Sequence, residues 1–317
     1  MRAWLLNEDN MANKCDMRWF KQTFHEEIDA ALAGTPFTLD LMTALACQET
    51  GMIWSILRKK DLSLDRILEL CVGDTIDAPS RKAFPKTKAA LLAVAQGQEM
   101  FELAHEALVD MAEFIPGFNG VASNPNKFCH GYGIFQLDLQ FFKDDPEHFL
   151  QKRFANFDDS LQKALDELQA ARKKIGLGNK PTLSDLELAH VAIAYNTGGF
   201  NPAKELKQGF KPPGGKFYGE QVFEFLQIAK TVSVEDEITT LPFTIDPDGP
   251  LFKVTATKLN LRSEPCVDSG SNIKASLKKG DIVQALSNQA VRGFLEVETV
   301  DPNGLTGFAS AQFLEQI

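Results

Sequence analysis

The sequence predicts a mainly α-helical domain followed by a small all-β barrel, and three observations predict this fold class. Most of residues 16–235 carries apolar residues at three- and four-residue spacing, which is typical of amphipathic helices. Residues 241–250, LPFTIDPDGP, contain three prolines and no helical pattern. After them come short runs of alternating apolar and polar residues, separated by turn residues. We therefore expect a helical domain over 1–240, a linker over 241–250 and a β module over 251–317.

Each element can be assigned from local patterns. The predicted helical segments include 38–50, 61–71, 86–113 and 159–175. The first of these follows Pro36 and is expected to end at Gly51. Gly, Pro and Asn clusters predict loops at 116–127 and 209–219. The predicted strands are 252–256, 259–262, 282–286, 294–300 and 305–309.

Size and composition restrict the possible functions. A chain of 317 residues with 44% hydrophobic and 24% charged residues is long enough for two ordinary globular domains. The net charge of −10 argues against a nucleic-acid partner, which normally requires a basic face. No apolar run has the length of a membrane span or of a signal peptide. We therefore expect synthesis in the cytoplasm, so that an extracellular substrate is reached only after release or secretion by another system.

The cysteine pattern predicts no metal site and no disulfide framework. The five cysteines are odd in number and scattered, at Cys15, Cys47, Cys71, Cys129 and Cys266. The sequence contains no CxxC pair and no Cys/His cluster. Free and mostly buried thiols in a reducing compartment are the expectation. No feature of the sequence calls for a cofactor.

Glu49 is the first candidate catalytic residue. Leu39, Met42, Leu45 and Ala46 form the apolar stripe of the predicted helix 38–50, and Glu49 follows four residues after Leu45 on the same face. Burial on an apolar face raises the pKa of a carboxyl group, as a general acid requires near neutral pH. The alternative is a glutamate at a helix end that pairs with a lysine or reaches solvent.

Two further motifs carry polar groups next to glycines. In GYGIFQLD, residues 131–138, glycines allow close approach of a ligand, and Gln136 offers hydrogen-bond donors and acceptors to sugar substituents. A simple turn that enters a strand or helix is the alternative. In AIAYNTGGFNP, residues 192–202, the ring of Tyr195 and the amide of Asn196 suit a sugar ring. A helix C-cap closed by Gly198 is equally compatible with that sequence.

Together and in this order, ALACQETG, GYGIFQLD and AYNTGG resemble the motifs of the lysozyme-like superfamily, in particular soluble lytic transglycosylases and goose-type lysozymes. The resemblance covers roughly 38–230 and includes YGEQV, with Tyr218, which looks like the last helix of the transglycosylase pattern. It implies the following roles: Glu49 as catalytic acid, Gly133 and Gln136 as the wall of the cleft, Tyr195 and Asn196 as substrate contacts, and Asp138 as the residue that positions water.

The chain departs from this pattern at three places. Thr50 follows Glu49 where the family usually has Ser, and Phe135 replaces the Met of the GLMQ element. More residues separate Glu49 from Gly133 along the sequence than is usual in the family. Residues 52–128 are therefore predicted to be an insertion with at least two helices. The resemblance gives no role for this segment.

The predicted β module resembles bacterial SH3 domains. TKLNLRSEP (257–265), LKKGDIV (277–283) and GLTGFASAQFL (304–314) are similar to the usual sequence elements of that family. Such domains commonly bind cell-wall peptides in wall hydrolases. Phe294 and Phe308 stand here at positions where tryptophans are expected. A packing or partner-binding role for the module is the alternative.

The resemblance implies a peptidoglycan glycosidase that cleaves the β-1,4 bond between N-acetylmuramic acid and N-acetylglucosamine, with Glu49 as general acid and base. The reaction is either hydrolysis, with Asp138 as the second carboxylate, or lytic transglycosylation, in which the muramoyl 6-hydroxyl attacks. A non-catalytic glycan- or partner-binding protein on the same scaffold is the alternative. Among the histidines, His105 is predicted to be structural, and a role for His130 in the cleft is left open.

Overall fold

The protein has a mixed helical and β fold. The structure, a computed structural model, describes residues 12–75, 81–244, 249–267, 272–300 and 304–317. Within these ranges it contains ten α-helices and an antiparallel sheet of eight strands. The chain divides into two compact units. Of the described residues, we call residue 12 and those within 19–232 the helical unit, and those within 13–18 and 233–317 the sheet unit.

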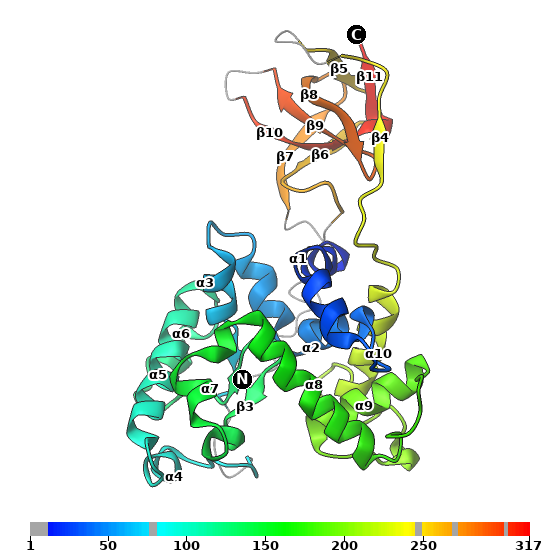
Figure 1. The fold of residues 1–317 in the computed structure, drawn as a ribbon. Coiled ribbons are helices and arrows are strands. Elements are labelled where there is room, and N and C mark those ends of the chain that lie inside the picture. The colour runs from blue at the N-terminus through cyan, green and yellow to red at the C-terminus, as the bar shows by residue number, and fades with distance from the viewer. Residues whose placement is uncertain (1–11, 76–80, 245–248, 268–271, 301–303) are drawn as a thin grey trace. The chain divides into compact units, whose positions relative to one another are not determined.

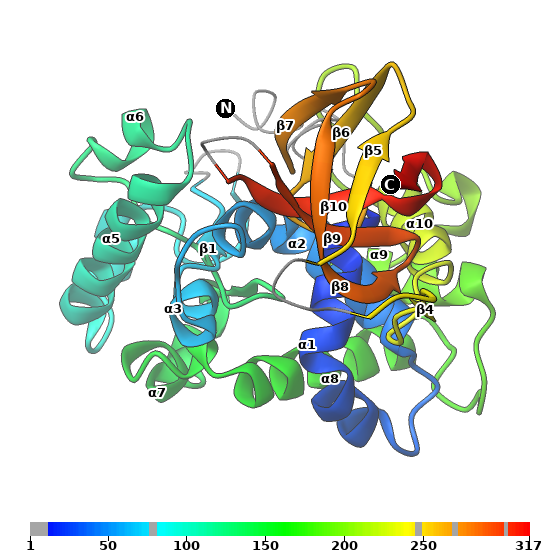
Figure 2. The same ribbon diagram turned by 90° about the horizontal axis from the view of Figure 1, so that it is seen from above.

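The helices of the described chain vary from one turn to five. They are α1 (Lys14–Leu32), α2 (Leu39–Leu57), α3 (Leu64–Glu69), α4 (Lys88–Leu92), α5 (Gly97–Phe114), α6 (Asn119–Ala122), α7 (Pro146–Leu150), α8 (Phe157–Lys174), α9 (Asp185–Thr197) and α10 (Tyr218–Ala229). Helices α3 to α7 lie on one side of α2 and α8, and α9 and α10 lie on the other side (Figures 1 and 2). Helix α10 packs on both α2 and α9.

Polar caps explain where several helices begin and end. The side chain of Thr38 accepts a hydrogen bond from Leu41 N at the start of α2. Ser184 and Glu187 form a reciprocal capping box at the start of α9. Gly198 ends α9 with a φ of 75°, a conformation that glycine adopts without steric cost. This C-cap is the one predicted from the sequence.

Two predicted helices differ from the observed ones. Helix α2 does not end at Gly51 but continues to Leu57. A Cβ at Gly51 would lie 3.0 Å from Ala12 Cβ, so this glycine provides close packing inside a helix. The predicted helix 86–113 is divided into α4 and α5, because Gln96 adopts a φ of 58° and turns the chain.

An aromatic cluster forms much of the core of the helical unit. The rings of Phe24 and Phe157 stack with centroids 3.9 Å apart, and Phe20 lies between Phe24 and Trp54. Lys21, next to Phe20 in the sequence, is a buried cation. Its Nζ donates to Asp40 Oδ1 at 2.5 Å and to the main-chain carbonyls of Ala229, at the end of α10, and Val232. The charge is thus paired and its hydrogen bonds are satisfied, as burial requires.

A small three-stranded sheet joins distant parts of the helical unit. Its strands are β1 (Val72–Gly73), β2 (Gly131–Tyr132) and β3 (Leu137–Asp138), in that order and antiparallel. Val72 pairs with Tyr132, and Gly131 pairs with Asp138. The sheet therefore places part of segment 52–128 directly beside the GYGIFQLD motif.

The sheet unit contains the eight-stranded antiparallel sheet. Its strands are β4 (Ile238–Thr240), β5 (Leu251–Val254), β6 (Lys258–Arg262), β7 (Ile273–Lys278), β8 (Ile282–Val291), β9 (Phe294–Thr299), β10 (Thr306–Ser310) and β11 (Leu314–Gln316). The strand order is β11-β5-β8-β9-β10-β6-β7, with β4 paired to β8. Figure 1 labels these strands. All the predicted strands are present, and side chains such as Val254, Leu261 and Val297 form the core. The sheet begins at β4, before the predicted linker.

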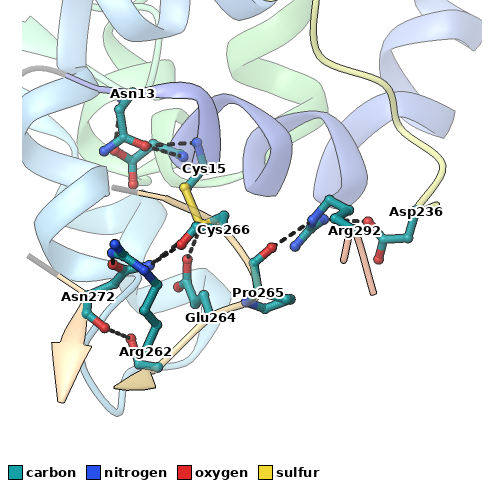
Figure 3. Close-up of a disulfide and its surroundings, with 11 residues drawn as sticks. Asn13, Cys15, Asp236, Arg262, Glu264, Pro265, Cys266, Asn272 and Arg292 are labelled. Atoms are coloured by element: carbon teal, nitrogen blue, oxygen red, sulfur yellow. Dashed lines mark hydrogen bonds and ion pairs between the residues drawn. A yellow bond between two sulfur atoms is a disulfide. The ribbon is translucent and has the colours of Figure 1, made fainter. Parts of the chain in front are cut away.

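The cysteine prediction was wrong in one respect. Cys15 and Cys266 form a disulfide within the sheet unit (Figure 3). Asn272 Nδ2 donates to Cys266 O at 2.9 Å, and Arg292 Nε donates to Pro265 O at 2.9 Å, so both sides of Cys266 are held. The partners are 251 residues apart in sequence, so spacing rules could not reveal the pair. The three other cysteines are not in a disulfide and are buried, as predicted: Cys47, Cys71 and Cys129.

Candidate active site

A cleft of about 1200 Å³ in the helical unit brings together six of the seven predicted site residues. The six that line it are Glu49, Gln136, Asp138, Tyr195, Asn196 and Tyr218. They come from α2, β3, α9, α10 and the turn between β2 and β3. Gly133 does not line the cleft. Residues that are up to 169 positions apart therefore meet at one surface.

Glu49 lies within α2 and is partly buried. Tyr218, at the start of α10, donates a hydrogen bond from its hydroxyl to Glu49 Oε1 at 2.7 Å. The Tyr218 side chain is buried, and burial, together with the charge of Glu49, raises the pKa of Tyr218 well above its usual value. Tyr218 is thus a neutral donor that holds one oxygen of Glu49 at any physiological pH.

An amide pair lies next to Glu49. Gln48 precedes Glu49 on α2, and its Nε2 donates to Gln221 Oε1 of α10 at 3.4 Å. Both side chains line the cleft. Gln48 Oε1 is buried and accepts no hydrogen bond from any residue that the structure describes. The amides of this pair are the kind of group that hydrogen-bonds to sugar hydroxyls and acetamido groups.

The turn from Gly133 to Gln136, which we call the wall turn, is held from two helices. Thr50, the residue after Glu49, donates from its hydroxyl to Ile134 O at 2.6 Å. Tyr195 of α9 donates from its hydroxyl to Phe135 O at 2.6 Å. The wall turn is therefore fixed to α2 directly beside Glu49, and to α9 on its other side.

Gln136 closes the wall turn from within. It has a φ of 57°, which is unusual for a residue with a side chain, and its Nε2 donates to Gly133 O at 2.9 Å. Its Oε1 lies so close to two neighbouring strands that a Cβ at Gly131 or Gly73 would be 2.3 or 2.9 Å away. These glycines thus make room for the side chain of Gln136. Gln136 both braces the turn and lines the cleft.

Gly133 supports the wall from behind. Its φ is 75°, and an added Cβ would lie 2.6 Å from Ser160 Oγ and 2.8 Å from Phe154 O. The residue packs against the start of α8, away from the cleft lining. Gly133 was predicted to form part of the cleft wall. It supports the wall turn by close packing but does not itself line the cleft.

Tyr195 and Asn196 lie in the last turn of α9. The ring of Tyr195 lines the cleft, and burial followed by the charge of Glu49 raises the pKa of Tyr195 well above its usual value. Asn196 is exposed and also lines the cleft. The motif therefore serves as a helix C-cap at Gly198 and as a cleft surface at the same time.

Asp138 ends β3 and caps the short 3₁₀ helix η3 (Leu139–Lys143), with Oδ1 accepting a hydrogen bond from Gln140 N at 2.7 Å. The same oxygen accepts a hydrogen bond from Arg81 Nη2 at 2.5 Å. Asp138 is therefore a helix cap, and its side chain also lines the cleft.

The two histidines weighed from sequence lie outside the cleft lining. His105 Nδ1 bonds Lys127 O at 2.8 Å, which gives it a structural partner. His130 is fully buried, and its Nδ1 donates to Asp74 O at 2.9 Å, since a carbonyl only accepts. Burial, followed by the charge of Arg81, lowers the pKa of His130. His130 is therefore a neutral side chain that links the residue before β2 to the residue after β1.

Among the described residues, four carboxylates and four cations line the cleft: Glu49, Asp74, Asp138, Glu167, Arg81, Lys82, Lys127 and Lys174. Of these, the sequence predicted only Glu49 and Asp138 as site residues. Burial, and to a lesser degree Asp166, raises the pKa of Glu167. Asp74 and Arg81 belong to segment 52–128, in a stretch without helical or strand periodicity. The only feature of the sequence that could have indicated Asp74 and Arg81 is their position in a loop, where functional side chains often occur.

Comparison of the chain with protein-family models, with curated proteins and with solved structures gave no match. In the part of the chain that the structure describes, no group of acidic, histidine or cysteine side chains has the arrangement of a metal site. None of the described helices is both long enough and apolar enough to cross a membrane.

Proposed function

We propose that this protein cleaves the glycan strands of bacterial peptidoglycan, with Glu49 as general acid and base in a lysozyme-like helical unit. One observation carries the proposal: Glu49, Gln136 of the wall turn and the Tyr195–Asn196 pair line one cleft, although they are distant in sequence. The same residues carry the resemblance to transglycosylases and goose-type lysozymes. A partly buried carboxyl group that a neutral hydroxyl orients is suited to donate a proton.

The shape and charge of the cleft support a polymeric saccharide as substrate. Its volume, about 1200 Å³, is larger than the roughly 300–1,000 Å³ of small-molecule sites. Among the residues that the structure describes, the four cations and four carboxylates of the lining balance, although the chain has a net charge of −10. An anionic wall polymer therefore meets a lining whose described charges cancel, and repulsion from the rest of the surface is largely screened by salt.

Two courses of the reaction are compatible with these residues. In both, Glu49 gives its proton to the glycosidic oxygen as the bond from that oxygen to C1 of the muramic acid breaks. In transglycosylation, the muramoyl 6-hydroxyl oxygen bonds to C1 and its proton returns to Glu49. In hydrolysis, a water oxygen bonds to C1, one water proton passes through Asp138 to solvent, and solvent restores the proton of Glu49.

We also propose that the sheet unit is an SH3-like module that binds wall peptides. The short antiparallel strands and the similarity of LNLRSEP and LKKGDIV to bacterial SH3 sequences support this proposal. Phe294 and Phe308 are both partly exposed and replace the expected tryptophans. The disulfide is typical of proteins that work in an oxidising compartment, which suits action on a cell wall after release from the cytoplasm.

The test compares the parent protein with Glu49→Gln on purified peptidoglycan. The amide is nearly isosteric but has no acidic proton, so release of soluble fragments should fall by about 10²–10⁴-fold while the melting temperature stays unchanged. Glu113→Gln is the matched control, because Glu113 is exposed on α5 and does not line the cleft.

Near-parent activity in folded Glu49→Gln would remove Glu49 from the mechanism. Binding of peptidoglycan by the parent protein without release of any fragment would favour the alternative, a glycan-binding protein on the same scaffold.

A further inference from the structure

Arg81 is a buried cation at the edge of the cleft, contributed by segment 52–128. Its side chain is 7% exposed. Nη2 donates to Asp138 Oδ1 at 2.5 Å and to Phe84 O at 2.9 Å, and Nε donates to Pro85 O at 3.1 Å. Nη1 lies 3.8 Å from Asp74 Oδ2. One guanidinium thus joins two cleft carboxylates to the main chain of its own loop.

The carbonyl oxygens of Phe84 and Pro85 hold the guanidinium of Arg81 in place independently of Asp138. A buried charge is tolerated only when its hydrogen bonds are satisfied, and here the loop carbonyls of Phe84 and Pro85 satisfy two of the donors. The planar guanidinium then has its remaining donors directed at fixed points. Because three of the five N–H donors are bonded and the side chain is only 7% exposed, Arg81 acts through Asp138 and has little surface for substrate.

Asp138 is held by two donors at one oxygen. Arg81 Nη2 and Gln140 N both bond to Oδ1. No described residue donates a hydrogen bond to Oδ2, and the side chain is 27% exposed in the cleft lining. Two donors from separate segments leave the carboxylate little rotational freedom. Oδ2 is thus the oxygen that a water molecule in the cleft meets.

We propose that Arg81 is a positioning residue, which holds Asp138 so that Oδ2 orients a water molecule toward the bond that Glu49 protonates. The inference rests on the proposed function and selects hydrolysis among its two courses. The water oxygen bonds to C1, the C1–glycosidic oxygen bond breaks, Glu49 supplies the proton of the leaving hydroxyl, and the water proton leaves through Asp138 to solvent. The role of segment 52–128 at the cleft is then to supply this cation.

The proposal is tested by the ratio of two products. Arg81→Gln removes the charge, and Arg81→Lys keeps the charge but loses the planar pair of donors. Because transglycosylation does not use Asp138, formation of 1,6-anhydro ends should change little. Reducing ends per folded enzyme should fall by about 10- to 100-fold in Arg81→Gln, and less in Arg81→Lys. Mass spectrometry of purified peptidoglycan digests measures both ends.

Two further variants keep the test decisive. Arg172→Gln is the matched control, because Arg172 is also a buried arginine bonded to main-chain carbonyls but does not line the cleft. It should leave the product ratio unchanged. Asp138→Asn keeps a good helix cap and removes the charge, so it should give the same product shift as Arg81→Gln even if the latter folds poorly.

An unchanged yield of reducing ends per folded enzyme in Arg81→Gln and Asp138→Asn would overturn the proposal. A parent enzyme that forms only anhydro ends would overturn it as well, but the proposed function would stand, since Glu49 would still cleave the strand. Loss of the proposed function is recognised separately, by the absence of both kinds of end.

Discussion

The cleft holds two of its carboxyl groups in different ways. Glu49 projects from the middle of α2 and receives a hydrogen bond from the neutral hydroxyl of Tyr218. Asp138 ends a short strand and is ion-paired with the guanidinium of Arg81. We call the part of the lining around Glu49 the Glu49 side, and the part around Asp138 the Asp138 side. A long helix supports the first, and a loop and a two-residue strand support the second.

In the proposed reaction, this difference suits the two carboxyl groups to two different roles. A general acid has to carry a proton, whereas a group that orients water has to be an acceptor. A neutral hydroxyl partner is compatible with either protonation state of Glu49. A guanidinium partner forms its strong, charge-assisted hydrogen bond with an ionised Asp138. The partners, more than the carboxyl groups themselves, distinguish the two sides.

The wall turn joins the two sides, and Gly133→Ala should disturb both. The added Cβ would meet Ser160 Oγ and Phe154 O inside contact distance, at a φ of 75°. We expect the free energy of unfolding to fall by about 3 kcal/mol. Denaturant titration gives this value.

Gly120→Ala is the matched control, because an added Cβ at Gly120 has no neighbour within 4 Å among the described residues and Gly120 lies in α6. Its stability should stay equal or rise by about 0.5–1 kcal/mol. Equal losses in the two variants would mean that the wall turn is not tightly packed.

Tyr218→Phe should affect the Glu49 side alone. The variant removes only the hydroxyl that orients Glu49 Oε1, so we expect turnover of peptidoglycan to fall by about tenfold, equal to about 1.4 kcal/mol. The ratio of reducing to anhydro ends should not change, because both courses use Glu49. A shift of that ratio, or no loss of turnover, would contradict the assignment of Tyr218 to the Glu49 side.

Lowering the pH should destabilise the structure around His130, on the Asp138 side, before it destabilises the Glu49 side. The pKa of His130 is lowered, so the folded state binds the proton less well than the unfolded state. The stability that neutral His130 provides is therefore present above its usual pKa of about 6.5 and is lost as the pH falls through the folded value, by at most about 1.4 kcal/mol per pH unit.

Hydrogen exchange at pH 7.5 and pH 5.5, corrected for intrinsic rates, measures this effect. Amides of β2 and of Leu139, whose N–H bonds His130 O, should lose more protection than amides of α2. Equal changes in β2 and α2 would show that protonation of His130 does not act locally.

The Glu49 side was largely predictable from sequence. Glu49 lies four residues after Leu45 on an apolar helix, so its position followed from periodicity. Tyr218 was named only from the resemblance of YGEQV to the last helix of the transglycosylase pattern, and it begins α10 at the end of the predicted loop 209–219. The sequence did not show that Tyr218 bonds Glu49, because no short-range signal specifies a contact across 169 residues.

The Asp138 side was predictable only in part. Asp138 was recognised from its motif, whereas Arg81 lies in a loop without periodicity and its partner is 57 residues away. The disulfide escaped prediction for the same reason, since Cys15 and Cys266 are 251 residues apart. In each case tertiary folding, rather than local pattern, created the pair. Gly51 and Gly131 could not be interpreted from sequence either, because glycine is needed at these positions for close packing and not for a turn.

Digestion of purified peptidoglycan in ¹⁸O-labelled water tests the central claim most directly. Fragments should be reduced with borohydride at once, because an open-chain sugar slowly exchanges its C1 oxygen with water. Mass spectrometry then identifies the ends at muramic acid. If Glu49 and Asp138 act as described, each cleaved strand has a muramic acid end with one ¹⁸O atom. Unlabelled anhydro ends would remove Asp138 from the reaction, and the absence of new ends of either kind would contradict the account as a whole.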